Sequence, residues 1–148
     1  FHIMLRVDIE SMLIDKSLKV ADLPIVWNEQ IKQYLDLEVP DDSQGVLQDI
    51  HWSGGQFGTF CNYTIGNVMA AQLMETMKKT NPEIQNDIDQ ANYEPLLNWL
   101  TSNIHTHGRR YTRNELLERS TGETLNPLPY INYLKGKASQ VYGVKFND

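Results

Sequence analysis

Residues 58–80 read GTFCNYTIGNVMAAQLMETMKKT, and this stretch sets the expected fold class. Its apolar side chains recur at a spacing that keeps them on one face of a helix. Lys78 and Lys79 follow near the C-terminal end, where cations interact favourably with the helix dipole. We therefore predict a long amphipathic helix here, with its apolar face formed by Ile65, Val68, Met69, Leu73 and Met77.

The segments on either side of this stretch also predict helices. Thr112 and Glu115 form a capping-box pattern, and Gly108, Gly122 and Gly143 follow helical patterns at positions where a left-handed residue is favoured. Sustained strand alternation is missing from the sequence, so the fold class is all-α, with one domain over residues 1–148. The further helices are expected within residues 1–15, 22–35, 95–107, 112–121 and 126–142.

The first residues show helical recurrence without a capping residue in front of Phe1. We interpret Phe1 as a cut inside a helix, so that the chain is a truncated part of a longer protein. Arg6 lies one turn before Glu10, a spacing typical of a structural ion pair.

Composition narrows the classes of partner. Thirteen Lys and Arg against nineteen Asp and Glu give a formal net charge of −6, which argues against nucleic acid and anionic membrane surfaces as partners. The single Cys61 excludes an internal disulfide and is expected to pack as a small apolar group. With neither a bilayer-spanning apolar run nor a secretory signal pattern in the sequence, we expect a cytoplasmic location.

Residues 45–55, GVLQDIHWSGG, place an amide, a carboxylate, an imidazole and an indole between glycines. Gly54, Gly55 and Gly58 would let the backbone approach a ligand or another segment closely, which favours a cleft wall. The structural alternative gives each polar group a packing role: Asp49 caps or pairs, His51 bonds to backbone, and Trp52 fills the core.

A metal centre is not expected within this chain. The sequence has no H-E-x-x-H, the pattern in which two His one turn apart bind zinc. His105 and His107 are close in sequence, but no nearby Cys or third His completes a ligand set.

GVLQDIHW matches every fixed position of the G-x-x-Q-D-x-H-W signature, and through it the chain resembles the thermostable, Taq-type family of zinc metallocarboxypeptidases. The resemblance extends over HIMLRVDIE, WSGGQFGTFCNYTIGNVMAAQL and NIHTHGRRYTRNELLERSTGETLNP. It implies a mostly helical fold with a deep groove. It also implies an enzyme that releases C-terminal residues from peptides with a free C-terminus. It also implies homodimers and a zinc ion held by the two His of H-E-x-x-H and a downstream Glu.

The chain also departs from the family pattern, and these departures limit the activity expected of it alone. Because the zinc-binding motif is missing, the chain resembles roughly the last third of such an enzyme, and its partner would be the N-terminal catalytic part. Zinc is therefore expected in the intact enzyme and not in this segment, which is predicted to be inactive by itself. Cys61 and Ile65 also depart from the residues typical of the family and are interpreted as packing changes.

The resemblance suggests roles for individual residues. His51 and Tyr63 are the predicted catalytic donors near the reacting carbonyl. Gln48, Asp49 and Trp52 are expected at the substrate-binding wall: Gln48 and Asp49 would orient the turn and hold the His51 tautomer, and burial of Trp52 would fix the loop.

Arg109 and Arg110 are candidates for binding a substrate carboxylate, although adjacent arginines after a helix also commonly form surface pairs. A different class of function is also open: a free-standing helical interaction module without catalysis. Such a module would expose Ile3, Leu5 and Ile9 and would dimerise or cover them with another chain.

Overall fold

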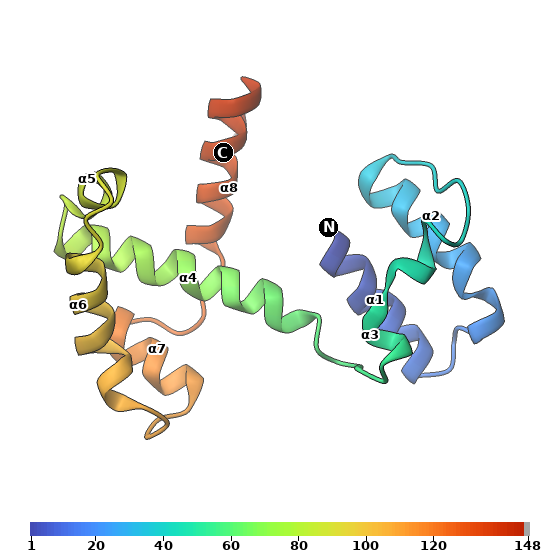
Figure 1. The fold of residues 1–148 in the computed structure, drawn as a ribbon, viewed down its shortest axis with the longest axis horizontal. Coiled ribbons are helices and arrows are strands. Elements are labelled where there is room, and N and C mark those ends of the chain that lie inside the picture. The colour runs from blue at the N-terminus through green and yellow to red at the C-terminus, as the bar shows by residue number, and fades with distance from the viewer. Residues whose placement is uncertain (147–148) are drawn as a thin grey trace. The chain divides into compact units, whose positions relative to one another are not determined.

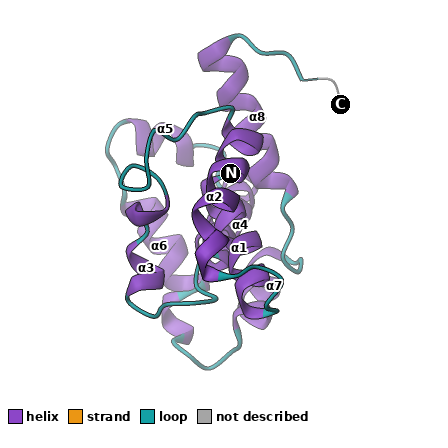
Figure 2. Ribbon diagram, turned by 90° about the vertical axis from the view of Figure 1, so that its right-hand side faces the viewer, coloured by secondary structure: helices purple, strands orange, loops and turns teal. Residues whose placement is uncertain are grey.

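A computed structural model of the chain describes residues 1–146, and over these residues the fold is all-helical, as predicted. Figure 2 shows helices joined by loops and turns throughout this range. The helices, labelled in Figure 1, are α1 (His2–Ile14), α2 (Leu23–Leu35), α3 (Ile50–Ser53), α4 (Cys61–Thr80), α5 (Ile84–Asp89), α6 (Glu94–Asn103), α7 (Arg113–Thr121) and α8 (Leu128–Tyr142). Short 3₁₀ turns occur at η1 (Val20–Asp22), η2 (Val46–Gln48) and η3 (His105–His107).

The chain divides into two compact units, Phe1–Ile65 and Gly66–Asp148, with the boundary inside α4. Each unit has its own set of buried apolar side chains, as a small packed core requires. The expectation of one domain over residues 1–148 stays a prediction. In the described part of the second unit the buried apolar residues are Val68, Met77, Ile84 and Leu117.

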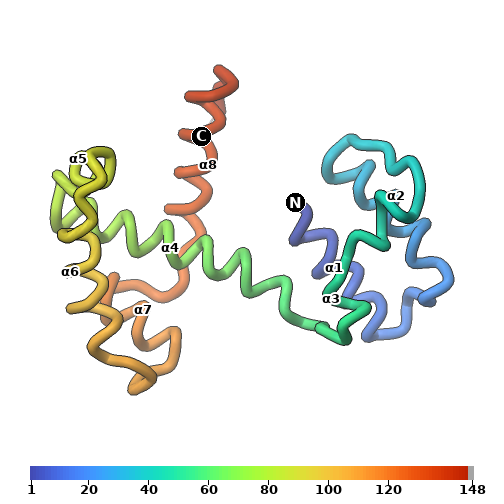
Figure 3. The backbone as a smooth tube through the Cα atoms, in the orientation of Figure 1, coloured from blue at the N-terminus to red at the C-terminus, as the bar shows by residue number. Residues whose placement is uncertain are grey.

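The first unit is built on α1 and α2, which pack against each other; Figure 3 traces both helices and the return of the chain through α3 beside α1. Leu5 and Ile9 of α1 are completely buried. The expectation that a free module would expose these two side chains is therefore wrong, because α2 and the following segment cover them. The core cluster consists of Leu5, Ile9, Leu18, Trp27, Ile31 and Val46.

The predicted ends of α7 and the predicted C-terminal end of α8 are confirmed. The Thr112 hydroxyl accepts from the Glu115 backbone N–H and the Glu115 carboxylate accepts from the Thr112 N–H, which is a capping box at the start of α7. Gly122 ends α7 with a φ of 80° and Gly143 ends α8 with a φ of 67°. The predicted C-terminal end of the helix at residues 95–107 is wrong, because α6 ends at Asn103 and the 3₁₀ turn η3 separates it from Gly108.

Gln72 of α4 holds the connection between α7 and α8. Its buried side-chain amide donates to the Thr121 hydroxyl at 3.2 Å and to the Thr124 carbonyl at 2.9 Å. Its carbonyl oxygen accepts from the Asn126 backbone N–H at 3.0 Å. One polar side chain thus satisfies three groups of the 121–126 connection, which positions the start of α8.

Within residues 1–146, every helix is too short or too polar to cross a lipid bilayer.

Candidate functional site

Residues 45–55 form two short helical segments, η2 and α3, with Gly45 at the start. A Cβ atom on Gly45 would lie 2.6 Å from the Val39 Cγ1 atom, so the close approach in this cluster occurs here. Nothing lies within 4 Å of a Cβ built on Gly55 or Gly58, so approach of a ligand to these later glycines stays a prediction. These two have φ values of 73° and 72°, a left-handed backbone that glycine adopts without strain.

Asp49 is the N-cap of α3 and accounts for the local fold. Its side chain is only 1% exposed, and Oδ1 accepts from the backbone N–H groups of His51 at 2.8 Å and Trp52 at 3.0 Å. Its other oxygen, Oδ2, accepts from the Arg6 Nε at 2.7 Å. Asp49 therefore has the capping and pairing roles of the structural alternative, and its carboxylate is closed to a ligand.

Arg6 joins α1 to this cluster. The predicted ion pair with Glu10 is wrong, because the Arg6 guanidinium points to Asp49 instead. It also lies 5.2 Å from the ring centroids of both Trp27 and Phe60, within the range of cation–π attraction. Burial, with the Arg6 cation beside it, lowers the pKa of His2.

Glu10 is a second buried carboxylate that binds the cluster, and sequence reasoning missed this role. Its Oε1 accepts from the Trp52 indole N–H at 3.1 Å and its Oε2 accepts from the Gly58 backbone N–H at 3.1 Å. These partners lie 42 and 48 residues away in the sequence, so no local spacing reports them.

His51 and Tyr63 lie side by side at the partly exposed edge of the cluster. The His51 side chain is 25% exposed and Tyr63, in the first turn of α4, is 53% exposed. The His51 Nε2 and Tyr63 hydroxyl oxygen are 3.5 Å apart, which is long for a hydrogen bond. One further atom placed beside this pair is therefore able to contact both polar atoms.

The other face of the His51 ring is held within the protein. Its Nδ1 is buried without a hydrogen-bond partner and lies 3.6 Å from Asp49 Oδ2. The Phe60 ring packs against the imidazole with 4.7 Å between centroids. The Asp49 carboxylate therefore faces the buried nitrogen of the ring.

Gln48 and Trp52 both stabilise the loop, through different contacts. The exposed Gln48 donates its amide N–H to the Ser43 carbonyl, which ties the turn before α3. Trp52 is partly buried and makes edge contacts with Trp27 at 5.9 Å and Phe60 at 6.0 Å between centroids. These contacts fit the predicted orienting role of Gln48 and the predicted packing role of Trp52.

Arg109 and Arg110 lie in the second unit, between η3 and α7, and both are exposed. Arg110 is 5.7 Å from the Tyr111 ring centroid, and among residues 1–146 neither arginine has an acidic partner within ion-pair distance. The structure describes them in a different unit from His51, so their part in one site with it stays a prediction.

The residues of the described chain do not fit a metal centre. No group of three or more His, Cys, Asp and Glu side chains within 1–146 is arranged to hold an ion. His107 instead contacts the Tyr111 ring at 5.4 Å between centroids. Cys61, which was expected to pack as a small apolar group, is exposed at the start of α4.

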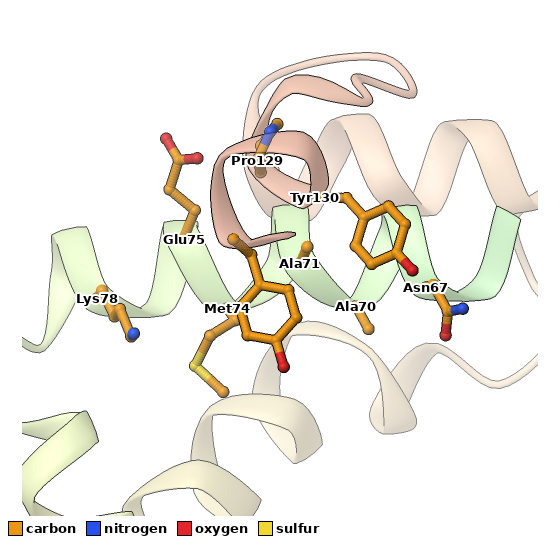
Figure 4. A pocket seen from close by; sticks show the side chains of 9 residues that line it. Asn67, Ala70, Ala71, Met74, Glu75, Lys78, Pro129 and Tyr130 are labelled. Atoms are coloured by element: carbon orange, nitrogen blue, oxygen red, sulfur yellow. The ribbon is translucent and has the colours of Figure 1, made fainter. Parts of the chain in front are cut away.

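The second unit also contains a pocket between α4 and α8, shown in Figure 4. Ala71 and Met74 of α4 and Tyr130 of α8 form its apolar lining. Asn67, Glu75 and Lys78 supply polar groups at its edge. Each of the residues predicted for a site lies outside it, so it provides no support for the predicted chemistry.

Comparison with known sequences places these observations in context. The family described as Carboxypeptidase Taq (M32) metallopeptidase matches residues 1–138. Carboxypeptidase 1 from Bacillus subtilis (strain 168) is 38% identical over 141 residues, which cover 95% of this chain and 28% of that protein. Thermostable carboxypeptidase 1 from Pyrococcus furiosus is 36% identical over 137 residues, again with 28% of its length covered.

Comparison with solved structures also finds similarity to carboxypeptidases. The crystal structure of the M32 carboxypeptidase from Deinococcus radiodurans R1 matches with a TM-score of 0.91 and 40% identity, covering 97% of this chain and 29% of that one. Metallocarboxypeptidase 1 from Trypanosoma cruzi matches with a TM-score of 0.87 and 41% identity, covering 92% and 29% of the two chains. The chain thus spans somewhat more than a quarter of the length of the proteins it resembles.

Proposed function

Because this chain belongs to the Carboxypeptidase Taq (M32) family of metallopeptidases, we propose that it forms one wall of the substrate groove of a carboxypeptidase. The enzyme would remove C-terminal amino acids from peptides with a free C-terminus. The observation that carries the proposal is the 3.5 Å separation of the His51 Nε2 and the Tyr63 hydroxyl at a partly exposed edge. The names of the curated relatives support the class of reaction.

The chemistry of peptide hydrolysis explains why these two groups would be used. Attack of water on the last peptide bond places negative charge on the carbonyl oxygen, and aligned donors lower the energy of that state. With a proton on Nε2, His51 donates to this oxygen, and the Tyr63 hydroxyl donates from the neighbouring position. Both groups would thus stabilise the tetrahedral intermediate.

The other predicted site residues would act on this pair or on the substrate. In our proposal Asp49 orients the His51 ring from its buried side, while Gln48 and Trp52 fix the loop that carries it. Arg109 and Arg110 would bind the carboxylate at the end of the peptide. Their exposed guanidinium groups support this role, since a planar guanidinium matches a carboxylate through two parallel hydrogen bonds.

The metal of the reaction would be held outside this chain, because the described residues provide no suitable donor set. We propose zinc, bound by an H-E-x-x-H motif in a separate catalytic part that is the chain's partner. Bound there, the ion would supply an activated water. The resemblance also supports a homodimer for the intact enzyme, the sequence composition supports a cytoplasmic location, and this chain would be inactive on its own.

A chimera tests the proposal, in which this chain replaces the matching segment of Carboxypeptidase 1 from Bacillus subtilis. We expect the chimera to release C-terminal residues and His51→Ala to lower kcat about 100-fold, the loss typical for one oxyanion donor. The melting temperature should change little, because the His51 side chain makes no short hydrogen bond.

His105→Ala is the matched control, since His105 is an exposed histidine of the second unit. It should leave kcat unchanged. A folded chimera without peptidase activity, or a His51→Ala variant that loses stability as much as turnover, would contradict the proposed role.

A further inference from the structure

Glu10 is a buried carboxylate in the middle of α1 whose position calls for an explanation beyond packing. It is 6% exposed, and in the described part of the chain no Lys, Arg or His lies within ion-pair distance of it. Burial of a charge is costly unless hydrogen bonds compensate. Here two neutral donors compensate, one at each oxygen: the Trp52 indole N–H and the Gly58 backbone N–H.

The two donors lie at the two ends of the segment that follows His51. Trp52 is the next residue within α3, and Gly58 closes the loop after it. Between them, the Gly55 N–H donates to the Trp52 carbonyl at 3.0 Å and the Gln56 N–H donates to the His51 carbonyl at 2.8 Å. By holding both ends of this loop, Glu10 fixes the backbone that carries the imidazole.

The same contact also places the surface on which the His51 ring rests. Phe60 comes two residues after Gly58 and packs against the imidazole at 4.7 Å between centroids. Trp52 in turn contacts Phe60 at 6.0 Å. One carboxylate therefore sets the helix that bears the ring and the aromatic side chain that supports it.

We propose that Glu10 is a positioning residue for His51, acting through Trp52 and Gly58. The inference rests on the proposed function, because it assigns Glu10 to the placement of the donor that the reaction would use. A donor placed even about 1 Å from its productive position loses most of its effect on a transition state. Glu10 would therefore influence turnover without touching substrate.

Glu10→Gln in the full chain tests the positioning directly. The amide nitrogen of Gln donates and cannot accept, so one of the two N–H groups loses its acceptor. We expect solvent exchange at the Trp52 indole or the Gly58 amide to become about tenfold faster, as loss of a hydrogen bond to a charged group predicts. The ring signals of His51 in NMR spectra should move at the same time.

Glu29→Gln is the matched control, because Glu29 is an exposed glutamate of α2 in the same unit. It should leave the exchange rates and the His51 ring signals unchanged. Unchanged ring signals in a folded Glu10→Gln chain would overturn the proposal. If that variant does not fold, Glu10→Asp decides, because it keeps the carboxylate and shortens the side chain by one methylene, which draws it away from the two donors: displaced His51 signals support the role of Glu10 and unchanged signals overturn it.

Kinetics in the chimera separate this inference from the proposed function. Glu10→Gln should lower kcat about tenfold with little change in KM, and it should have no further effect when His51 is already Ala. If the double variant loses kcat by the product of the two single losses, Glu10 does not act through His51. If His51→Ala alone leaves kcat unchanged, the proposed function fails, while the exchange and ring signals still decide the positioning by Glu10.

Discussion

Arg6 and Asp49 form the ion pair that ties the predicted site to the first helix. The Asp49 side chain is 1% exposed and that of Arg6 is 14% exposed, so solvent screens this pair far less than a surface pair. Asp49 also accepts from two backbone N–H groups of α3. Its removal would leave a largely buried cation and two donors without an acceptor, which is a larger loss than that of one contact.

We therefore predict that Asp49→Ala lowers the free energy of unfolding by about 3 kcal/mol, the cost typical of breaking a buried pair from one side. Urea unfolding of the chain measures this change. Glu38→Ala is the control, since Glu38 pairs with Lys32 but is 82% exposed, and it should change the stability little. Adding Arg6→Met to Asp49→Ala should cost less than the sum of the two single changes, and additive costs would contradict a coupled pair.

Arg6 and Glu10 show which contacts of single residues a sequence pattern can predict and which it cannot. Arg6 and Glu10 have the spacing of a helical ion pair, but a spacing of four residues reports only that two side chains share a helix face. In the structure each binds a different partner more than 40 residues away. The polar side chains gathered within residues 45–55 predict a site from the sequence, whereas the contacts of these residues with α1 depend on the tertiary fold.

Helices with strong end signals are the elements that the sequence predicts best. The capping box and Gly122 locate α7, and the long apolar stripe locates α4. Sequence reasoning missed α5, because Ile84 and Ile88 are its only apolar residues and six residues span less than two helical turns. It also missed α3, a four-residue helix that depends on the Asp49 cap.

The capping box of α7 gives the stability of this helix a dependence on pH. Hydrogen bonds from the Thr112 hydroxyl, and then from the Thr112 backbone N–H, lower the pKa of Glu115 from its ordinary value of 4.5. A carboxyl whose folded pKa is depressed stabilises the fold above the unfolded pKa, and this contribution is lost as the pH falls through the folded pKa. We predict that Thr112→Val lowers the melting temperature by a few degrees at pH 7.

The difference in melting temperature between Thr112→Val and the unchanged chain should shrink as the pH falls below 4.5, because protonation of Glu115 weakens its contact with the Thr112 hydroxyl in the unchanged chain, and the variant lacks this contact. Thermal unfolding followed by circular dichroism at several pH values measures it. Thr106→Val is the control: the Thr106 hydroxyl donates to the Ser102 carbonyl and contacts no carboxylate. A difference independent of pH would show that the Glu115 carboxylate takes no part in the cap.

At the scale of the whole molecule, the sequence predicts the all-α class and the structure confirms it. The division into two compact units was not predicted, because no linker composition marks residues 65 and 66, which lie inside one continuous helix. Arg109 and Arg110 illustrate the consequence for the site. Their residue type suggests carboxylate binding, but a shared site with His51 depends on an arrangement that local patterns do not report.

Peptidase activity of the chain by itself would require side chains that bind a metal ion. Lowering the pKa of a bound water toward neutrality requires an ion held by several protein ligands with one position open. No cluster of three such side chains exists in the part of the chain that the structure describes. We therefore predict that the purified chain, incubated with zinc and a peptide bearing a free C-terminus, releases no amino acids above the rate in buffer.

Carboxypeptidase 1 from Bacillus subtilis serves as the positive control in that assay, and a peptide with a blocked C-terminus reports contaminating endopeptidases. Release of free amino acids is measured by mass spectrometry over several hours. Steady removal of C-terminal residues by the chain, abolished by a chelator and restored by zinc, would contradict the prediction. It would mean that His51 or its neighbours gather into a metal site that their arrangement here does not form.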